Sequence, residues 1–413
     1  MCAAGTDPAA RIRAALDRLA GDLPRLGVAV SGGGDSIALM HVIAEWASGR
    51  RQVRVATVDH GLRPESADEA AQVAQAASVL GLPHDRLPWR HGGDLPGNLM
   101  ANARNARLML MSEWAGEQGL PAIALGHTED DQAETLLMRL MRGAGIDGLA
   151  GMAERREAMG ICWLRPMLRV GRAELREWLT GRGIGWIDDP SNENADFDRV
   201  RIRQAMAAFG ITPDALARSA ENLRDARAAL SHYTAQAAAG AIARNGSLIL
   251  PLAPIREAPP EIARRLLIAG CRWITGADYP PRRATVLHAM QAVFSGGRVT
   301  LNGMLIEPSD DDLRFCREPA AALRAGSSRG PTWDNRWKIT GLQPHEHVAA
   351  LGYAPLSGLD WRATGLTRDE AAASPAVWSG GELRAAPLLE PGKTHGISPL
   401  RDATHLPSLL MAH

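Results

Sequence analysis

A glycine-rich turn between an apolar strand and a helix constrains this chain more than any other feature. Residues 25–30 predict a strand, Ser31-Gly32-Gly33-Gly34-Asp35-Ser36 a turn, and residues 36–47 a helix. Glycines let the backbone approach an anion closely, and the first N–H groups of the helix lack intrahelical acceptors. Asp35 would repel bound phosphates unless a divalent cation lay between them, so the turn predicts a nucleotide with Mg²⁺. The alternative is an ordinary glycine turn.

Strands and helices alternate along the first part of the chain. Further strands are expected at 53–58 and 122–125, and further helices at 66–80, 98–118 and 130–141. This alternation predicts an α/β fold, a parallel sheet with helices on both faces, and ligands bind such sheets at the carboxyl ends of the strands.

Composition excludes several classes of protein. The 413 residues carry no net charge, and the four cysteines form no C-x-x-C pair, so the sequence predicts neither a zinc ribbon nor a dithiol redox site. The length of the chain is enough for two or three domains. We find no apolar run long enough to span a membrane and no leader at the N-terminus, so we expect a cytoplasmic protein.

Three segments follow or flank the predicted strands and carry candidate site residues. Asp59 ends the second strand, where it can shape a nucleotide pocket. Arg104 and Arg107 are three apart, so they lie on one face of the helix 98–118. The segment 125–135 contains the most candidate catalytic side chains. His127 is suited to carry a charge or to transfer a proton, and Asp131 and Glu134 share a helix face. A capping cluster of acidic residues is the structural alternative for 129–134.

The order of these motifs resembles a known family. The turn lacks the lysine of a Walker loop and the G-x-G-x-x-G of dinucleotide sites, and its S-G-G-x-D-S spacing is similar to the PP-loop of ATP pyrophosphatases. With V-D-H-G-L-R, A-R-N-A-R, G-H-T-E-D-D-Q-A-E-T, R-G-A-G-I-D-G-L-A-G-M, R-P-M-L, W-I-D-D-P-S-N and F-D-R-V-R-I-R, the first half of the chain resembles tRNA(Ile)-lysidine synthetases.

The resemblance implies an ATP-dependent ligation with free L-lysine and a tRNA(Ile) of CAU anticodon as partners. ATP would adenylate the C2 carbonyl oxygen of the wobble cytidine, and the amino group of lysine would displace AMP to give lysidine. It implies no membrane partner and leaves the oligomeric state open, with a homodimer as one option.

The resemblance also implies roles for individual residues. Those for ATP binding are Ser31, Gly32, Gly33, Gly34, Asp35, Ser36 and Asp59. Asp35 and Asp131 would bind Mg²⁺, and His127 would stabilise charge near the activated oxygen. Glu134 and Arg107 would position lysine or nucleotide. The arginines for tRNA are Arg104, Arg199, Arg201 and Arg203.

The remainder of the chain is less informative. We expect a PP-loop catalytic domain over 1–210, a helical domain that binds tRNA over 211–325, and a small α+β C-terminal region over 326–413 that is a further candidate for tRNA binding. Helices are expected at 212–240 and 262–273, and residues 297–301 and 313–316 are expected to form a hairpin-like pair. The alternative functions are a PP-loop tRNA thiolase, which would need a cysteine pair, and a regulator that binds an adenine nucleotide without turnover.

Overall fold

The computed structural model describes residues 7–61, 66–90, 99–188, 198–277, 279–390 and 395–411, without the side chains of Leu99, Met100, Ala101, Arg104 and Met411. Two compact units form, residues 1–226 and 227–413, and each is described by itself. The division into domains at 210/211 and 325/326 stays a prediction.

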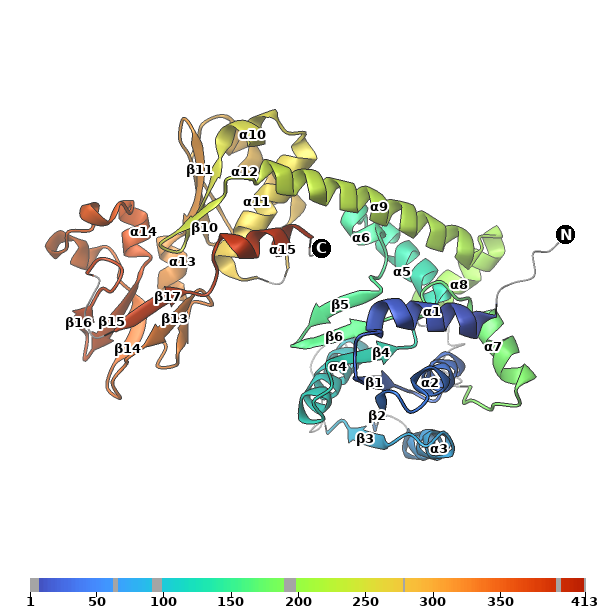
Figure 1. Ribbon diagram of the computed structural model, residues 1–413. Coiled ribbons are helices and arrows are strands. Elements are labelled where there is room, and N and C mark those ends of the chain that lie inside the picture. Colours follow the sequence, from blue (N-terminus) through green and yellow to red (C-terminus); the bar gives the residue numbers. More distant parts are fainter. Residues whose placement is uncertain are drawn as a thin grey trace. The chain divides into compact units, whose positions relative to one another are not determined.

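The first unit is built on a six-stranded sheet of order β3-β2-β1-β4-β6-β5, parallel except for the last strand (Figure 1). Its strands are β1 (Arg25–Ala29), β2 (Gln52–Asp59), β3 (His84–Pro88), β4 (Ala122–Leu125), β5 (Arg155–Ala158) and β6 (Ile161–Leu164). Its helices are α1 (Pro8–Ala20), α2 (Gly34–Ala47), α3 (Ser66–Val79), α4 (Leu99–Glu117), α5 (Glu129–Met141), α6 (Ile146–Leu149), α7 (Arg172–Gly181) and α8 (Asp198–Phe209), and α9 (Pro213–Ala237) begins in it. The expected parallel sheet is confirmed.

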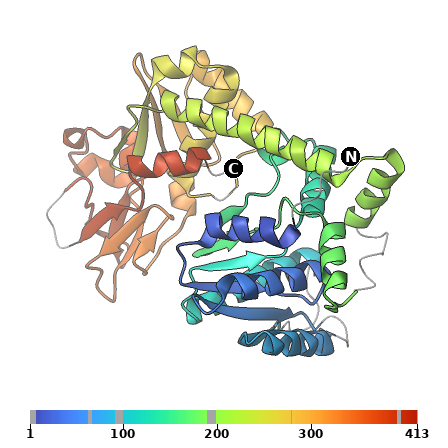
Figure 2. The same ribbon diagram turned by 45° about the vertical axis from the view of Figure 1, so that its right-hand side comes forward.

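Alternating side chains of the strands build a core on each face of this sheet. Val28 of β1 and Ala124 of β4 pack in the core with α1, α2, α3 and α7. Ala29 and Ile123 are adjacent to Val28 and Ala124 in these strands and point to the other face, where they pack in a second core with α4. Helices therefore cover both faces, as expected, and Figure 2 shows the same layers from a second side.

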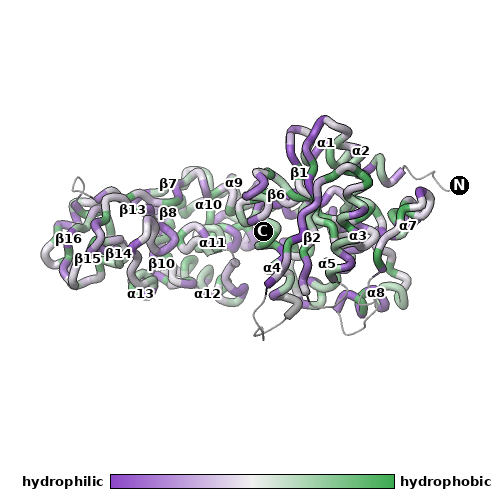
Figure 3. The backbone as a smooth tube through the Cα atoms, turned by 90° about the horizontal axis from the view of Figure 1, so that it is seen from below, coloured by the Kyte–Doolittle hydropathy of each residue, from purple (hydrophilic) through white to green (hydrophobic). Residues whose placement is uncertain are grey.

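The second unit contains three antiparallel sheets and several helices. The strands are β7 (Ile242–Arg244), β8 (Ser247–Pro251), β9 (Val299–Leu301), β10 (Met304–Pro308), β11 (Asp312–Arg317), β12 (Thr332–Trp333), β13 (Trp337–Thr340), β14 (His347–Ala350), β15 (Pro375–Ser379), β16 (Glu382–Ala385) and β17 (Gly396–Pro399). The helices are α10 (Leu252–Glu257), α11 (Pro260–Thr275), α12 (Arg283–Phe294), α13 (Pro319–Arg324), α14 (Arg368–Ala372) and α15 (Leu406–Met411). Figure 3 shows hydrophobic and hydrophilic residues interleaved along many of these elements.

One pairing expected in the second unit is wrong. Residues 297–301 and 313–316 do not pair with each other, because β9 and β11 both pair with β10, which lies between them. Asn302 and Gly303 both have positive φ, at 48° and 79°, and join β9 to β10. Asn-Gly between two strands is the strongest short hairpin signal, and it places the turn at 302–303.

Two further findings concern the described residues alone. Cys162, Cys271 and Cys316 are buried free thiols. Within the same residues, no helix combines the length and the apolar character needed to cross a membrane.

Candidate active site

The glycine turn between β1 and α2 is held by its own side chains. Ser36 Oγ donates to the carbonyl of Gly33 at 2.9 Å and accepts from the backbone N–H of Ser31 at 3.2 Å. Gly32 has a φ of +92°, and a Cβ there would lie 2.6 Å from Cδ1 of Ile187. Only glycine fits such a position without strain. These contacts therefore fix the backbone at the start of α2, a candidate position for an anion.

The end of β4 lies directly against this turn. A Cβ on Gly126 would be 3.2 Å from both the backbone nitrogen and the Cα of Ser36. The absent side chain lets the two segments approach closely. His127, the next residue, begins the segment that leads into α5, so the structure brings the glycine turn and the His127 segment together.

The two carboxylate oxygens of Asp131 make different contacts. Its Oδ2 accepts from the backbone N–H of Thr128 at 2.8 Å, a bond that belongs to the capping box of α5, and also from the Thr128 hydroxyl at 3.1 Å. Its Oδ1 lies 3.1 Å from Arg199 and 3.5 Å from Arg172. The capping explanation of this acidic segment is thus correct for one oxygen, and the other remains directed at cations.

Arg172, at the start of α7, joins the acidic residues into one cluster. Its guanidinium lies 3.0 Å from Asp35, 3.5 Å from Asp131 and 3.5 Å from Glu134. Sequence reasoning missed this arginine, which lies 137 residues from Asp35. The weak signal available was its position in the segment that follows the R-P-M-L motif. We call Asp35, Asp131, Glu134 and Arg172 the charged cluster.

The arginines of α8 divide into two groups. Arg199 and Arg203 each lie 3.7 Å from a Glu134 oxygen. Arg201 is 61% exposed at its side chain and pairs with Asp198 instead. Residues four apart share a helix face and residues two apart do not, which explains the division. The side chain of Arg104, also predicted to bind tRNA, lies outside the described residues.

Burial sets the protonation of the cluster. It raises the pKa of Asp35 and of Glu134, helped by neighbouring carboxylates and opposed by Arg172. Burial lowers the pKa of His127 well below its ordinary range, and nearby arginines, Arg107 among them, act in the same direction. Among the described residues, His127 Nδ1 is buried without a hydrogen-bond partner. The lowered pKa favours the neutral form of the His127 imidazole.

Asp59 contacts a different set of residues. Its carboxylate pairs with Arg86 of the neighbouring strand and accepts from the N–H of Gly61 at 3.0 Å. A hydrogen bond from Ser66, with those two contacts, lowers the pKa of Asp59 to about 2 despite its burial. These contacts fix the loop that follows β2, and the structure gives Asp59 no contact with the charged cluster in the part of the chain that it describes.

The carboxylates of the cluster are candidate ligands for a divalent cation. Asp35 and Asp131 contact the same guanidinium, so a single cation can reach both carboxylates. In residues 7–61, 66–90, 99–188, 198–277, 279–390 and 395–411, no group of three metal-ligating side chains forms a cage. Mg²⁺ usually takes one or two carboxylates and completes its shell with water and substrate phosphate, which fits this donor set.

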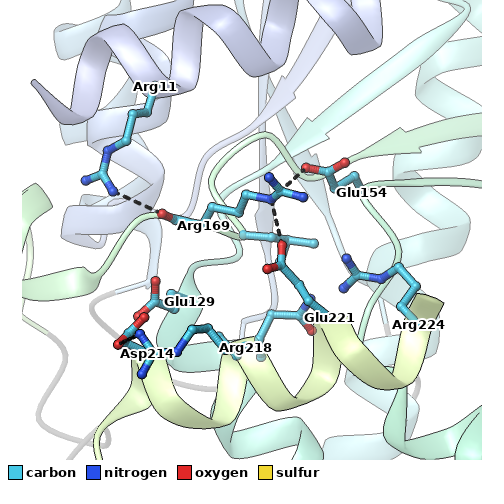
Figure 4. Close-up of a pocket in the computed structure, with 11 residues that line it drawn as sticks. Arg11, Glu129, Glu154, Arg169, Asp214, Arg218, Glu221 and Arg224 are labelled. Carbon is cyan, nitrogen blue, oxygen red and sulfur yellow. Dashed lines mark hydrogen bonds and ion pairs between the residues drawn. The ribbon is translucent and has the colours of Figure 1, made fainter. Parts of the chain in front are cut away.

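A separate hollow of about 230 Å³ is lined in part by residues of α5 (Figure 4). Glu129 and Gln132 line it from α5, whereas Asp131 and Glu134 belong to the charged cluster. Arg169 spans the hollow and pairs with Glu221 at 2.9 Å and with Glu154 at 3.9 Å. Its arginines and acids largely neutralise one another, so it does not share the chemistry of the cluster.

Comparisons with known proteins show which family the chain resembles. A family model described as a PP-loop domain matches residues 8–208. The chain is 48% identical over 372 residues to a tRNA(Ile)-lysidine synthase of Ruegeria pomeroyi, which covers 88% of each chain. It is 40% identical to one of Methylobacterium nodulans (74% of this chain, 94% of the relative) and 36% identical to one of Rhizobium meliloti (79% and 75%).

Proposed function

Because the chain belongs to the tRNA(Ile)-lysidine synthase family, we propose that it joins free L-lysine to C2 of the wobble cytidine in the tRNA(Ile) of CAU anticodon. ATP first adenylates the C2 carbonyl oxygen and releases pyrophosphate, and an amino group of lysine then displaces AMP. One observation carries the proposal: Asp35 of the glycine turn and the two acids of α5 meet at the guanidinium of Arg172. The nucleotide loop and the acidic segment thus share one site.

In the first step, the chain's task is to bind and orient the triphosphate. The backbone N–H groups at the start of α2 and the hydroxyls of Ser31 and Ser36 would hold the pyrophosphate part of ATP. Asp35 and Asp131 would hold Mg²⁺. When bound, that ion would neutralise charge on the phosphates as the carbonyl oxygen attacks the α-phosphorus.

In the second step, lysine must bind as an ammonium and react as an amine. Glu134 and Asp131 can pair with the ammonium, and the raised pKa of buried Glu134 favours it as the group that takes the proton. The C2–N bond forms as the C2–O bond to AMP breaks, and the released proton goes to the carboxylate.

The remaining residues would act on charge and on tRNA. His127 is neutral, so its role would be to donate a hydrogen bond near the activated oxygen rather than to supply a positive charge. Arg107 and Arg199 supply positive charge around it. Arg201, exposed on α8, would meet a tRNA phosphate. We propose the cytoplasm as the location, because tRNA, ATP and lysine occur together there.

Label transfer tests the proposal directly. The protein is incubated with ATP, radiolabelled lysine and a tRNA(Ile) transcript of CAU anticodon, with a transcript carrying uridine at the wobble position as the matched control. We expect label in the first transcript alone. Sulfur incorporation would support a thiolase, nucleotide binding without turnover would support a regulator, and either result would overturn lysine ligation.

A further inference from the structure

Arg172 is held at the centre of the charged cluster by its own backbone. Its N–H donates to Oδ2 of Asp130 at 2.7 Å, which fixes the first residue of α7 beside α5. Its side chain is only 20% exposed and reaches three carboxylates from two helices. The position is unfavourable for a cation in one respect, because a helix N-terminus is itself positive. The three carboxylates offset this cost.

The other arginines of the site do not replace Arg172. Arg199 and Arg203 contact Asp131 or Glu134 from α8. Among the described residues, Asp35 has an ion pair with Arg172 alone. The carboxylate that belongs to the glycine turn is therefore neutralised by one guanidinium, which also contacts the two acids expected to serve the metal and lysine.

We propose that Arg172 is the resident counter-cation of this site and competes with a divalent cation for Asp35 and Asp131. The inference rests on the proposed function, in which ATP and a divalent cation bind here. A guanidinium and a divalent cation within a few ångströms repel each other, so both cannot occupy the same carboxylates without added negative charge. The triphosphate of ATP supplies that charge.

A coupling between ATP and the cation follows from this competition. Without ATP, Arg172 occupies the carboxylates and keeps the divalent cation weakly bound. With ATP, the guanidinium can turn to a phosphate oxygen, with which arginine pairs well, and Asp35 is released for the cation. Arg172 thereby makes cation binding conditional on the nucleotide.

Mn²⁺ binding without ATP tests this role. Free Mn²⁺ is titrated by electron paramagnetic resonance with the full chain, with Arg172→Ala and Arg172→Gln, and with Arg176→Ala as control. Arg176 lies one turn further along α7, is 53% exposed and pairs with Asp188. We expect the two Arg172 variants to bind Mn²⁺ about tenfold more tightly than the natural protein, with the control unchanged. A folded Arg172 variant with unchanged or weaker Mn²⁺ binding overturns the proposal.

Further arms keep the result interpretable. Arg172→Lys keeps the positive charge but cannot span three carboxylates, so its Mn²⁺ affinity should fall between those of the natural protein and Arg172→Gln. An affinity equal to the natural one counts against the proposal. The assay needs neither tRNA nor lysine. Tighter Mn²⁺ binding in the variants, with no lysine transfer by the natural protein, would retain the role of Arg172 and overturn the proposed function. Absence of Mn²⁺ binding in every protein, with ATP present, would overturn both.

Discussion

Arg172 Nε donates to Oδ2 of Asp35 at 3.0 Å, and this contact joins the start of α7 to the first turn of α2. Two segments far apart in the sequence are thereby placed side by side at the proposed nucleotide site.

Asp35→Ala should abolish ATP–pyrophosphate exchange. The substitution removes the carboxylate expected to face the metal, and loss of one group that stabilises developing charge typically costs on the order of 100-fold in rate. Exchange of labelled pyrophosphate into ATP, in the presence of tRNA, measures the effect. Glu45→Ala is the control, because Glu45 lies near the other end of α2 and is 40% exposed. Near-normal exchange in Asp35→Ala would remove the metal role.

Substitutions of Asp131 should separate its cap from its charge. Asparagine can still accept from the N–H of Thr128, so Asp131→Asn should keep most of the stability and lose activity. Asp131→Ala should lose activity and also about 1 kcal/mol of unfolding free energy, the usual cost of a lost cap. Urea unfolding and lysine transfer are measured on both variants. Equal stability of the two variants would show that the capping box contributes little.

Neighbouring glycines of the turn should differ in their tolerance of a methyl group. Gly32→Ala combines a φ of +92° with a contact of 2.6 Å to Ile187, and we expect a loss of roughly 1–3 kcal/mol. Gly33→Ala has a φ of −67° and meets only Ser31 Oγ at 3.9 Å, so we expect less than about 1 kcal/mol. Unfolding free energies measure both. Equal losses would contradict the described shape of the turn.

His127 should stay neutral at every pH at which the protein is folded. Burial lowers its pKa to about 3, so the neutral form contributes its stability above the unfolded pKa and that stability is lost as the pH falls toward about 3. In NMR spectra, the ring protons of His127 should not shift between pH 5 and 8. An inflection of His127 near pH 6.5 would contradict its neutral role.

Local sequence predicted the elements that carry the site. The strand expected at 122–125 is β4 to the residue, because four apolar residues lie between a proline and the turn at Gly126. Strand β3 gave no such signal: it is an edge strand of the sequence His-Asp-Arg-Leu-Pro, and its polar side chains obscure any alternation.

The charged cluster could be predicted only in part. Asp35 and Asp131 lie in segments that follow strand ends, where ligands bind such sheets, and Glu134 shares a helix face with Asp131, so the sequence predicts these three as candidates. Arg172 follows no such rule, since its place in the cluster depends on how α7 docks beside α2 and α5. Contacts between distant segments leave no local pattern in the sequence. The position of the Arg172 guanidinium therefore follows only from the three-dimensional structure.

A double-mutant cycle tests most directly whether Asp35 and Asp131 serve a single cation. Mn²⁺ affinity is measured by electron paramagnetic resonance in the presence of a non-hydrolysable ATP analogue, for the natural protein, Asp35→Asn, Asp131→Asn and the double variant. If both carboxylates hold one ion, each single change weakens binding by about tenfold or more and the double variant loses clearly less than the sum of the two free energies. Strictly additive losses, or Mn²⁺ binding unchanged in either single variant, would contradict a shared site.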